Sequence, residues 1–283
     1  MVKKSWQIGV VLSAGLMISA GAWAAGSKLT EQTVQYESLT AKISAFEVKP
    51  AGAGKHPAIV LVHDKDGLTD GMKNIARSFA EAGFVVLMPD FPSRIEAQKK
   101  GGNLPMDQMT GIVSKVSRLN VAKTVADVDA AYDLLAKNLS VDAAKISGVG
   151  IGWGGWRVYK MAEDKGSLYR AVIFYGVTPD DGLLGNVKAP VLAHYAQGDF
   201  YTTSSAFKTA TWLGKKFTYH IYKDTYAGFF GGGSGNVDLA SAVGEGGVDA
   251  AAAALKEAEK NRVIDDGPIS KKLAMERTLA FLK

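Results

Sequence analysis

The chain has 283 residues, of which 47% are hydrophobic and 22% charged, a balance that excludes a disordered, collagen-like or coiled-coil protein and is typical of one globular domain or at most two. The absence of cysteine excludes thiolate nucleophiles, structural zinc–thiolate sites and iron–sulfur clusters. The formal net charge of +5 is too small and too scattered to indicate a nucleic-acid-binding protein.

The first residues have the three parts of a secretory signal peptide. Two lysines lie within Met1–Gln7, an apolar run follows from Ile8 to about Gly21, and small residues at Ala22 and Ala24 precede Ala25. A membrane anchor is the alternative, but the run is shorter than the ~20 residues that a span needs. We therefore expect cleavage after Ala24, a mature domain over residues 25–283 that is periplasmic or secreted, and no membrane span after cleavage.

The mature chain alternates between strand-like and helix-like patterns. Strands are expected, in chain order, at Thr33–Ser38, Ala41–Val48, Ala58–Val62, Phe84–Met88, Ile146–Ile151, Ala171–Tyr175, Val191–Tyr195 and Phe217–Tyr222. Helices are expected at Gly71–Ala82, from Val121 to Leu134, and at Trp156–Ala162, Ser204–Leu213 and Leu273–Leu282. Such alternation predicts an α/β fold, with a mostly parallel sheet covered by helices on both faces. A site is then expected beyond the carboxyl ends of the strands.

A glycine-rich turn at Gly148–Gly155 joins an expected strand to an expected helix. It fits the dinucleotide-binding spacing formally, but that site needs an acidic residue at the end of the next strand, which here ends in Tyr175-Gly176. The other interpretation is a nucleophile elbow, a strained turn whose flanking glycines avoid a Cβ clash. The missing acidic residue favours the elbow.

Six further stretches occur in a characteristic order: Val62–Leu68, Pro89–Phe91, Gly150–Gly155, His194–Asp199, Tyr222–Phe229 and Glu276–Leu282. In this order they resemble the dienelactone hydrolase family of the α/β-hydrolase fold, over nearly the whole mature chain. The resemblance implies an α/β-hydrolase-type sheet. It also implies a cysteine–histidine–acid triad that acts on esters or lactones without a cofactor or metal.

Two positions of the implied triad hold residues that cannot perform its chemistry. The nucleophile position corresponds to Gly152 and the histidine position to Ala227, whereas the acid position is filled by Asp199. The family's glutamate after the first buried strand corresponds to Asp64, which is one methylene shorter. A triad works only with all three groups within hydrogen-bond reach, so covalent catalysis is not expected. Asp199 has the alternative role of capping the next helix.

Other side chains near these loops offer no clear substitute for the missing groups. Tyr226 adjoins the histidine position, but a phenol with a pKa near ~10 is a poor base at neutral pH. Ser204 and Ser205 are expected to cap a helix. His63 and His194 adjoin buried strands and are interpreted as core residues. His220 is expected to face solvent, and Trp153 and Trp156 to pack.

The backbone donors of an oxyanion hole do not depend on the lost side chains. In this fold they are the amide of the residue after the nucleophile, here Trp153, and one from the loop near Lys65. With Asp64 and Tyr226 these residues form the expected binding site for a small carbonyl or anionic ligand. The first hypothesis is thus a pseudoenzyme that binds such a ligand or a periplasmic protein. The alternative is an active hydrolase of small esters or lactones, with water activated by Asp64 or Asp199.

One stretch is compositionally unusual. A Gly- and Ala-rich insertion is expected from about residue 230 to 266, beginning as a flexible loop at Phe229–Gly235 and continuing as a helix at Val248–Ala258. Long loops in compact domains are usually functional or disordered, so this insertion is a second candidate for partner binding.

Overall fold

The computed structural model describes residues 29–94, 119–179, 183–222, 225, 228–231, 264–265 and 271–283. The predicted signal peptide, Tyr226, Ala227 and the Ala-rich part of the insertion lie outside these residues. Among the described helices, none is both long and apolar enough to cross a membrane.

Nine strands of the described chain form one sheet in the order β1-β2-β4-β3-β5-β6-β7-β8-β9. The hairpin β1–β2 is antiparallel, β2 joins β4 antiparallel, and every pairing from β4 onward is parallel. The strands are β1 Leu29–Ser38, β2 Ala41–Pro50, β3 His56–Val62, β4 Val85–Pro89, β5 Val141–Ile151, β6 Ala171–Phe174, β7 Val191–Ala196, β8 Phe217–Tyr222 and β9 Ile264–Asp265. This mostly parallel sheet confirms the fold class expected from the alternating patterns.

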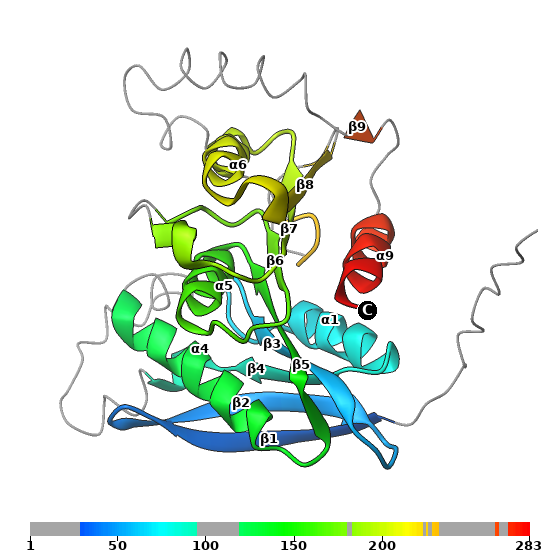
Figure 1. The fold of residues 1–283 in the computed structure, drawn as a ribbon. Helices are drawn as coiled ribbons and strands as arrows, with labels where there is room; N and C mark the ends of the chain where they lie inside the picture. Colours follow the sequence, from blue (N-terminus) through cyan, green and yellow to red (C-terminus); the bar gives the residue numbers. More distant parts are fainter. Residues whose placement is uncertain are drawn as a thin grey trace, which may run out of the picture.

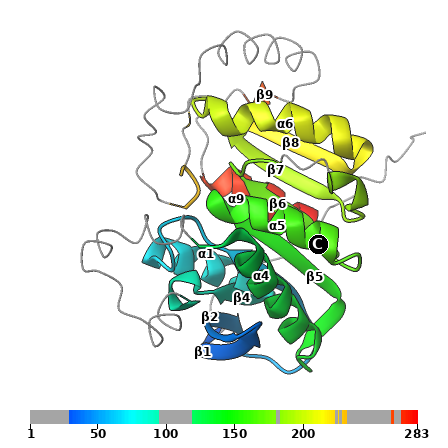
Figure 2. The same ribbon diagram turned by 90° about the vertical axis from the view of Figure 1, so that its left-hand side faces the viewer.

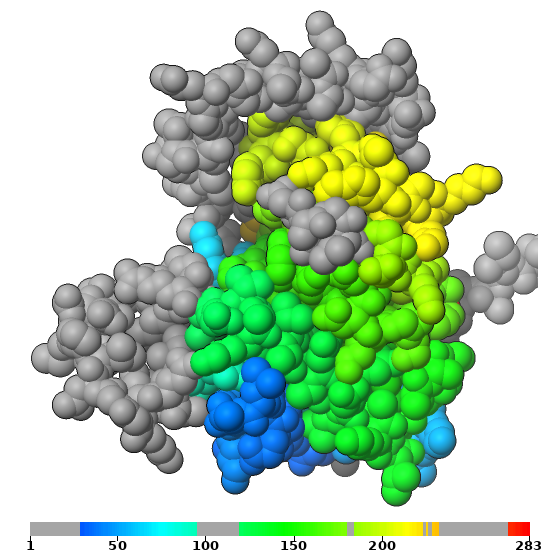
Figure 3. Space-filling model, turned by 60° about the vertical axis from the view of Figure 1, so that its left-hand side comes forward, coloured from blue at the N-terminus to red at the C-terminus, as the bar shows by residue number. Residues whose placement is uncertain are grey.

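Helices cover both faces of the sheet (Figure 1). One face carries α4, α5 and α6, and the other carries α1 and α9; Figure 2 shows the three helices of the first face lying across the strands. Their bounds are α1 Asp70–Glu81, α4 Val121–Ala136, α5 Trp153–Asp164, α6 Phe200–Leu213 and α9 Lys271–Leu282, with short 3₁₀ turns η2 Leu183–Asn186 and η3 Gly214–Lys216. In the space-filling view the blue β1–β2 hairpin lies at one end of the described chain and the yellow α6 region toward the other (Figure 3).

The core consists of two apolar layers, one on each face of the sheet. The central strands β3 and β4 are buried on both faces, which explains their unbroken apolar sequences. On one side Val128, Val158 and Ala206 of the three helices pack against the sheet. Because the strands from β4 to β8 are parallel, their carboxyl ends meet at one edge of the sheet, where the loops that carry the predicted site emerge.

Several element boundaries differ from the sequence prediction: β1 begins at Leu29 and β5 at Val141, both earlier than expected, and two helices also begin earlier. Helix α6 begins at Phe200, with Asp199 as its N-cap, so Ser204 and Ser205 lie inside the helix and the prediction that they cap it is wrong. Their hydroxyls instead donate to the carbonyl oxygens three residues earlier, of Tyr201 and Thr202. Helix α5 begins directly at the elbow, three residues before the predicted start.

A buried ion pair joins the turn after β4 to α4. The Arg94 and Asp127 side chains are 1% and 0% exposed, and Arg94 Nε donates to Asp127 Oδ2 at 2.6 Å. Arg94 also donates to the Ser38 carbonyl, and the Tyr36 hydroxyl donates to the Asp127 carbonyl. The turn, the helix and the β1–β2 hairpin are thus held together by one polar cluster.

The two ends of the unusual insertion are anchored to the fold. Phe230 is fully buried, with its ring stacked on Phe174 at 3.8 Å between centroids, so this residue belongs to the core and not to the flexible loop predicted there. At the other end, Ile264–Asp265 pairs in parallel with β8. The predicted helix at Val248–Ala258 lies outside the described residues.

Candidate functional site

The turn at Gly152 has the backbone of a nucleophile elbow. Gly152 has φ +51° and ψ −114°, a left-handed conformation that favours glycine. A Cβ on Gly150 would lie 2.6–2.8 Å from the backbone of Gly154 and Gly155, so the flanking glycine allows the strand and helix to meet closely. The strained turn is therefore present, but its apex carries no side chain.

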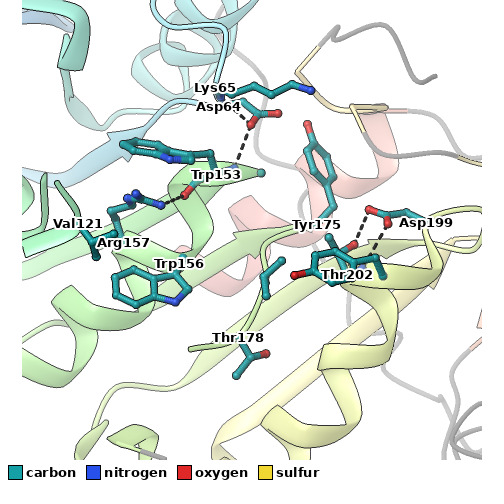
Figure 4. Close-up of a pocket in the computed structure, with 13 residues that line it drawn as sticks. Asp64, Lys65, Val121, Trp153, Trp156, Arg157, Tyr175, Thr178, Asp199 and Thr202 are labelled. Carbon is teal, nitrogen blue, oxygen red and sulfur yellow. Dashed lines mark hydrogen bonds between the residues drawn. The ribbon is translucent and has the colours of Figure 1, made fainter. Parts of the chain in front are cut away.

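The carboxylate of Asp64 occupies the space that a side chain at position 152 would need. A Cβ built on Gly152 would lie 2.3–2.4 Å from Oδ1, Cγ and Oδ2 of Asp64. Asp64 Oδ1 accepts hydrogen bonds from the amides of Lys65 at 2.7 Å and Trp153 at 2.9 Å. These are the two amides that the sequence predicted as oxyanion donors, and they converge on one oxygen (Figure 4).

Burial sets the electrostatics of this carboxylate. Loss of solvent raises the pKa of Asp64 above its ordinary value, although the amides of Trp153 and Lys65 stabilise the charged form and oppose the shift. Burial likewise raises the pKa of Tyr175, and the charge of Asp64 adds to the increase. Tyr175 itself has a positive φ of 38° and its hydroxyl accepts from the Gly231 amide at 3.1 Å. Burial is thus the main cause of the shift in both groups.

A cavity of about 570 Å³ opens beside this turn. This volume is in the usual range for small-molecule sites. The cavity wall combines aromatic, apolar and charged side chains: Asp64, Lys65, Val121, Gly152, Trp153, Trp156, Arg157, Tyr175, Val177, Thr178, Asp199, Tyr201 and Thr202. Figure 4 shows the indoles and Arg157 on one side and Asp199 on the other.

Asp199 lies in the cavity wall, but its carboxylate caps helix α6. Oδ1 accepts from the Thr202 amide at 3.2 Å and Oδ2 accepts from the Thr202 hydroxyl at 2.5 Å. The side chain is 6% exposed, and burial raises its pKa while the bonds from Thr202 oppose that rise. The capping role considered from the sequence is therefore the one that the contacts show.

Two of the histidines are held in the core. His63 is fully buried, its Nδ1 donates to the Asp64 carbonyl at 2.6 Å when its Nε2 accepts from the Phe91 amide, and burial lowers its pKa to about 4. His194 bonds the hydroxyls of Tyr222 and Thr278. His220 is half-buried and stacks on His194, so the prediction that it faces solvent is wrong.

The structure brings together some predicted residues and adds others. Asp64, Lys65 and Trp153 meet at the elbow, whereas Tyr226 lies outside the described residues. Trp153 packs on Phe91 and also lines the cavity, so packing is only part of its role.

Arg157 was not predicted as a site residue. The sequence feature that could have identified it is a cationic residue one helical turn after Trp153, in the first turns of a buried helix. Within the described ranges, no three His, Asp or Glu side chains gather closely enough to hold a metal ion.

Comparison with known proteins relates this geometry to one family. The profile described as "Dienelactone hydrolase family" matches residues 43–265. The chain is 27% identical over 168 residues to the protein named "Putative carboxymethylenebutenolidase" of Methylorubrum extorquens, a match that covers 56% of each chain. It is 26% identical over 200 residues to the protein of the same name from Saccharolobus solfataricus, covering 60% of this chain and 76% of the other. The chain thus spans little more than half of the Methylorubrum protein.

Solved structures of the same kind share the fold. A dienelactone hydrolase-like promiscuous phosphotriesterase from metagenomic libraries superposes with a TM-score of 0.61 at 19% identity, covering 81% of this chain and 98% of the other. The dienelactone hydrolase of Anabaena variabilis gives a TM-score of 0.57 at 17% identity, covering 81% and 96%. At this identity the likeness establishes the α/β-hydrolase-like fold alone.

Proposed function

The chain belongs to the dienelactone hydrolase family, and we propose that it is an exported member without covalent hydrolase activity that binds a ligand in the cavity beside the elbow. One observation carries the proposal. The Asp64 carboxylate lies where the nucleophile side chain would be, and it accepts the hydrogen bonds of the two amides that would stabilise an oxyanion. A carbonyl substrate would have to displace this carboxylate before it could reach either amide.

Two further features support a binding role. The position that corresponds to the family's histidine is Ala227, so no imidazole is supplied there to move a proton. The cavity beside the elbow nonetheless remains large enough for a small ligand. A binding protein needs this cavity and does not need the triad.

The alternative of water activation by Asp64 or Asp199 has less support. Burial raises the pKa of both carboxylates, but each already accepts two hydrogen bonds from protein donors, which oppose that rise and compete with a water for the carboxylate oxygens. Neither has an imidazole partner among the described residues.

Hydrolysis of p-nitrophenyl acetate and a dienelactone tests the proposal. We expect the wild type to match a buffer blank. The double variant Gly152→Cys/Ala227→His should also match it, because the new Cβ meets Asp64; adding Asp64→Ala should give measurable turnover, since the triad acts as a unit. Wild-type turnover that is lost in Asp64→Asn or Asp199→Asn would establish the alternative.

Export is a separate part of the proposal. It rests on the pattern of residues 1–24, which lie outside the described structure. The intact mass of the protein from a periplasmic or secreted fraction should correspond to a chain that begins at Ala25. A protein that retains Met1 and sediments with membranes would contradict export.

A further inference from the structure

Arg157 is a buried cation in the cavity wall. It is 6% exposed, its Nη1 donates to the Trp153 carbonyl at 3.0 Å, and its Nε donates to the Thr124 hydroxyl at 3.4 Å. Within the described part of the chain, no carboxylate lies within the 4 Å of an ion pair with it. An arginine in this setting keeps its charge and needs a counter-charge.

The acidic residues of the same cavity do not supply that counter-charge. Asp64 is held by the amides at the elbow, and Asp199 is held by Thr202 at the start of α6. Figure 4 shows both carboxylates away from the guanidinium of Arg157. Burial alone lowers the pKa of Arg157 to about 9, with no acidic neighbour to oppose the shift. Arg157 is therefore a buried cation of the cavity wall that no described carboxylate pairs with.

Two indoles fix the position of this cation. The Cζ of Arg157 lies 3.4 Å from the ring centroid of Trp153 and 5.5 Å from that of Trp156. Stacking on aromatic faces holds the guanidinium plane. Nε and Nη1 already donate to Thr124 and Trp153, which leaves the N–H groups of Nη2 and the second N–H of Nη1 for an acceptor. Trp156 and Val121 provide apolar wall on the same side of the cavity (Figure 4).

We propose that the Arg157 end of the cavity binds a small organic anion, with its carboxylate against the guanidinium and its flat apolar body along Trp156. A guanidinium binds a carboxylate through two parallel hydrogen bonds, which makes this pairing stronger and more directional than a neutral contact. The inference deepens the proposed function by naming the ligand class. In this arrangement the anion binds away from the elbow amides, which already donate to Asp64.

Binding of benzoate to the full mature chain, followed by tryptophan fluorescence, tests this proposal. Benzamide has the same shape without the charge, and we expect it to bind at least tenfold more weakly. Arg157→Gln should weaken benzoate binding at least tenfold. The control Arg170→Gln removes another arginine that contacts aromatic rings, but that residue does not line the cavity, so benzoate affinity should stay within twofold.

The outcomes separate this proposal from the loss of catalysis. Equal binding of benzoate and benzamide, no binding of benzoate, or unchanged binding by Arg157→Gln would overturn it. If inorganic phosphate binds as tightly as benzoate, the proposed contact between the apolar body of the ligand and Trp156 is overturned. If Arg157→Gln fails to fold, Arg157→Lys decides: it keeps the charge without the paired donors, and benzoate affinity should fall several-fold. Ester turnover by the wild type would refute the proposed function without altering these binding results.

Discussion

Replacing Gly152 by alanine measures how firmly Asp64 holds the nucleophile position. The chain provides a matched control, because Gly214 has φ +52° and ψ −127°, close to the +51° and −114° of Gly152. A Cβ on Gly214 would meet nothing within 4 Å, whereas a Cβ on Gly152 would meet the Asp64 carboxylate at 2.3–2.4 Å. The two substitutions therefore share the backbone strain and differ in the steric overlap.

The expected magnitudes follow from these contacts. An alanine held in this sparsely populated positive-φ region costs roughly 1–3 kcal/mol, which is the full expected effect of Gly214→Ala. In Gly152→Ala the carboxylate must also leave its two amides. A hydrogen bond to a charged group contributes about 1.5–3 kcal/mol, and cavity water replaces part of the loss, so we expect roughly 2–4 kcal/mol beyond the control.

Urea unfolding of the two variants, in the wild type and in an Asp64→Ala background, provides the assay. In the Asp64→Ala background the overlap disappears, so Gly152→Ala should cost no more than Gly214→Ala. Equal costs in the wild-type background would refute the reasoning. An excess cost that persists without Asp64 would show that some other contact is responsible.

Three further predictions concern buried charge. The pKa of His63 is lowered to about 4, so between pH 6.5 and 4 mainly the unfolded chain binds this proton, and stability falls as the pH is lowered. In urea unfolding, the stability advantage of wild type over His63→Gln should shrink by about 2 kcal/mol from pH 7 to pH 5, and an unchanged advantage would count against this prediction. Burial raises the pKa of Asp129 to about 7, so the charged carboxylate destabilises the folded state as the pH rises. After allowance for the partial exposure of Asp129, Asp129→Asn should be more stable than wild type by about 1 kcal/mol at pH 8, and this gain should vanish by pH 4 in the same assay. Arg94→Met leaves Asp127 buried without its partner and should cost about 3–5 kcal/mol in the free energy of unfolding, whereas a loss below 1 kcal/mol would contradict the buried pair.

The fold was predictable because its signals are local and repeated. Unbroken apolar runs such as Ala58–Val62 identify strands buried on both faces, and the glycines around Gly152 identify the turn between β5 and α5. One error arose where capping decides a boundary. Asp199 accepts from the Thr202 amide and starts α6 at Phe200, an outcome that the apolar spacing of the helix does not encode.

The site was predictable only in part. The sequence identified the loops that carry Asp64 and Trp153, because each follows a buried strand. It could not show that the Asp64 carboxylate reaches into the space above Gly152 and accepts from the Trp153 amide, since that hydrogen bond joins residues 89 positions apart. Arg157 was missed for a similar reason: its lack of a carboxylate partner is a property of the folded surroundings and not of the sequence around it.

The ion pair between Arg94 and Asp127 has a consequence for the chain between them. It fixes Arg94 and Asp127 relative to each other in the folded state. The entropy of closing a flexible loop grows only with the logarithm of its length, and each doubling adds about 0.6 kcal/mol. A change in the length of the chain between the two residues should therefore cost little in closure entropy, as long as Arg94 and Asp127 are kept.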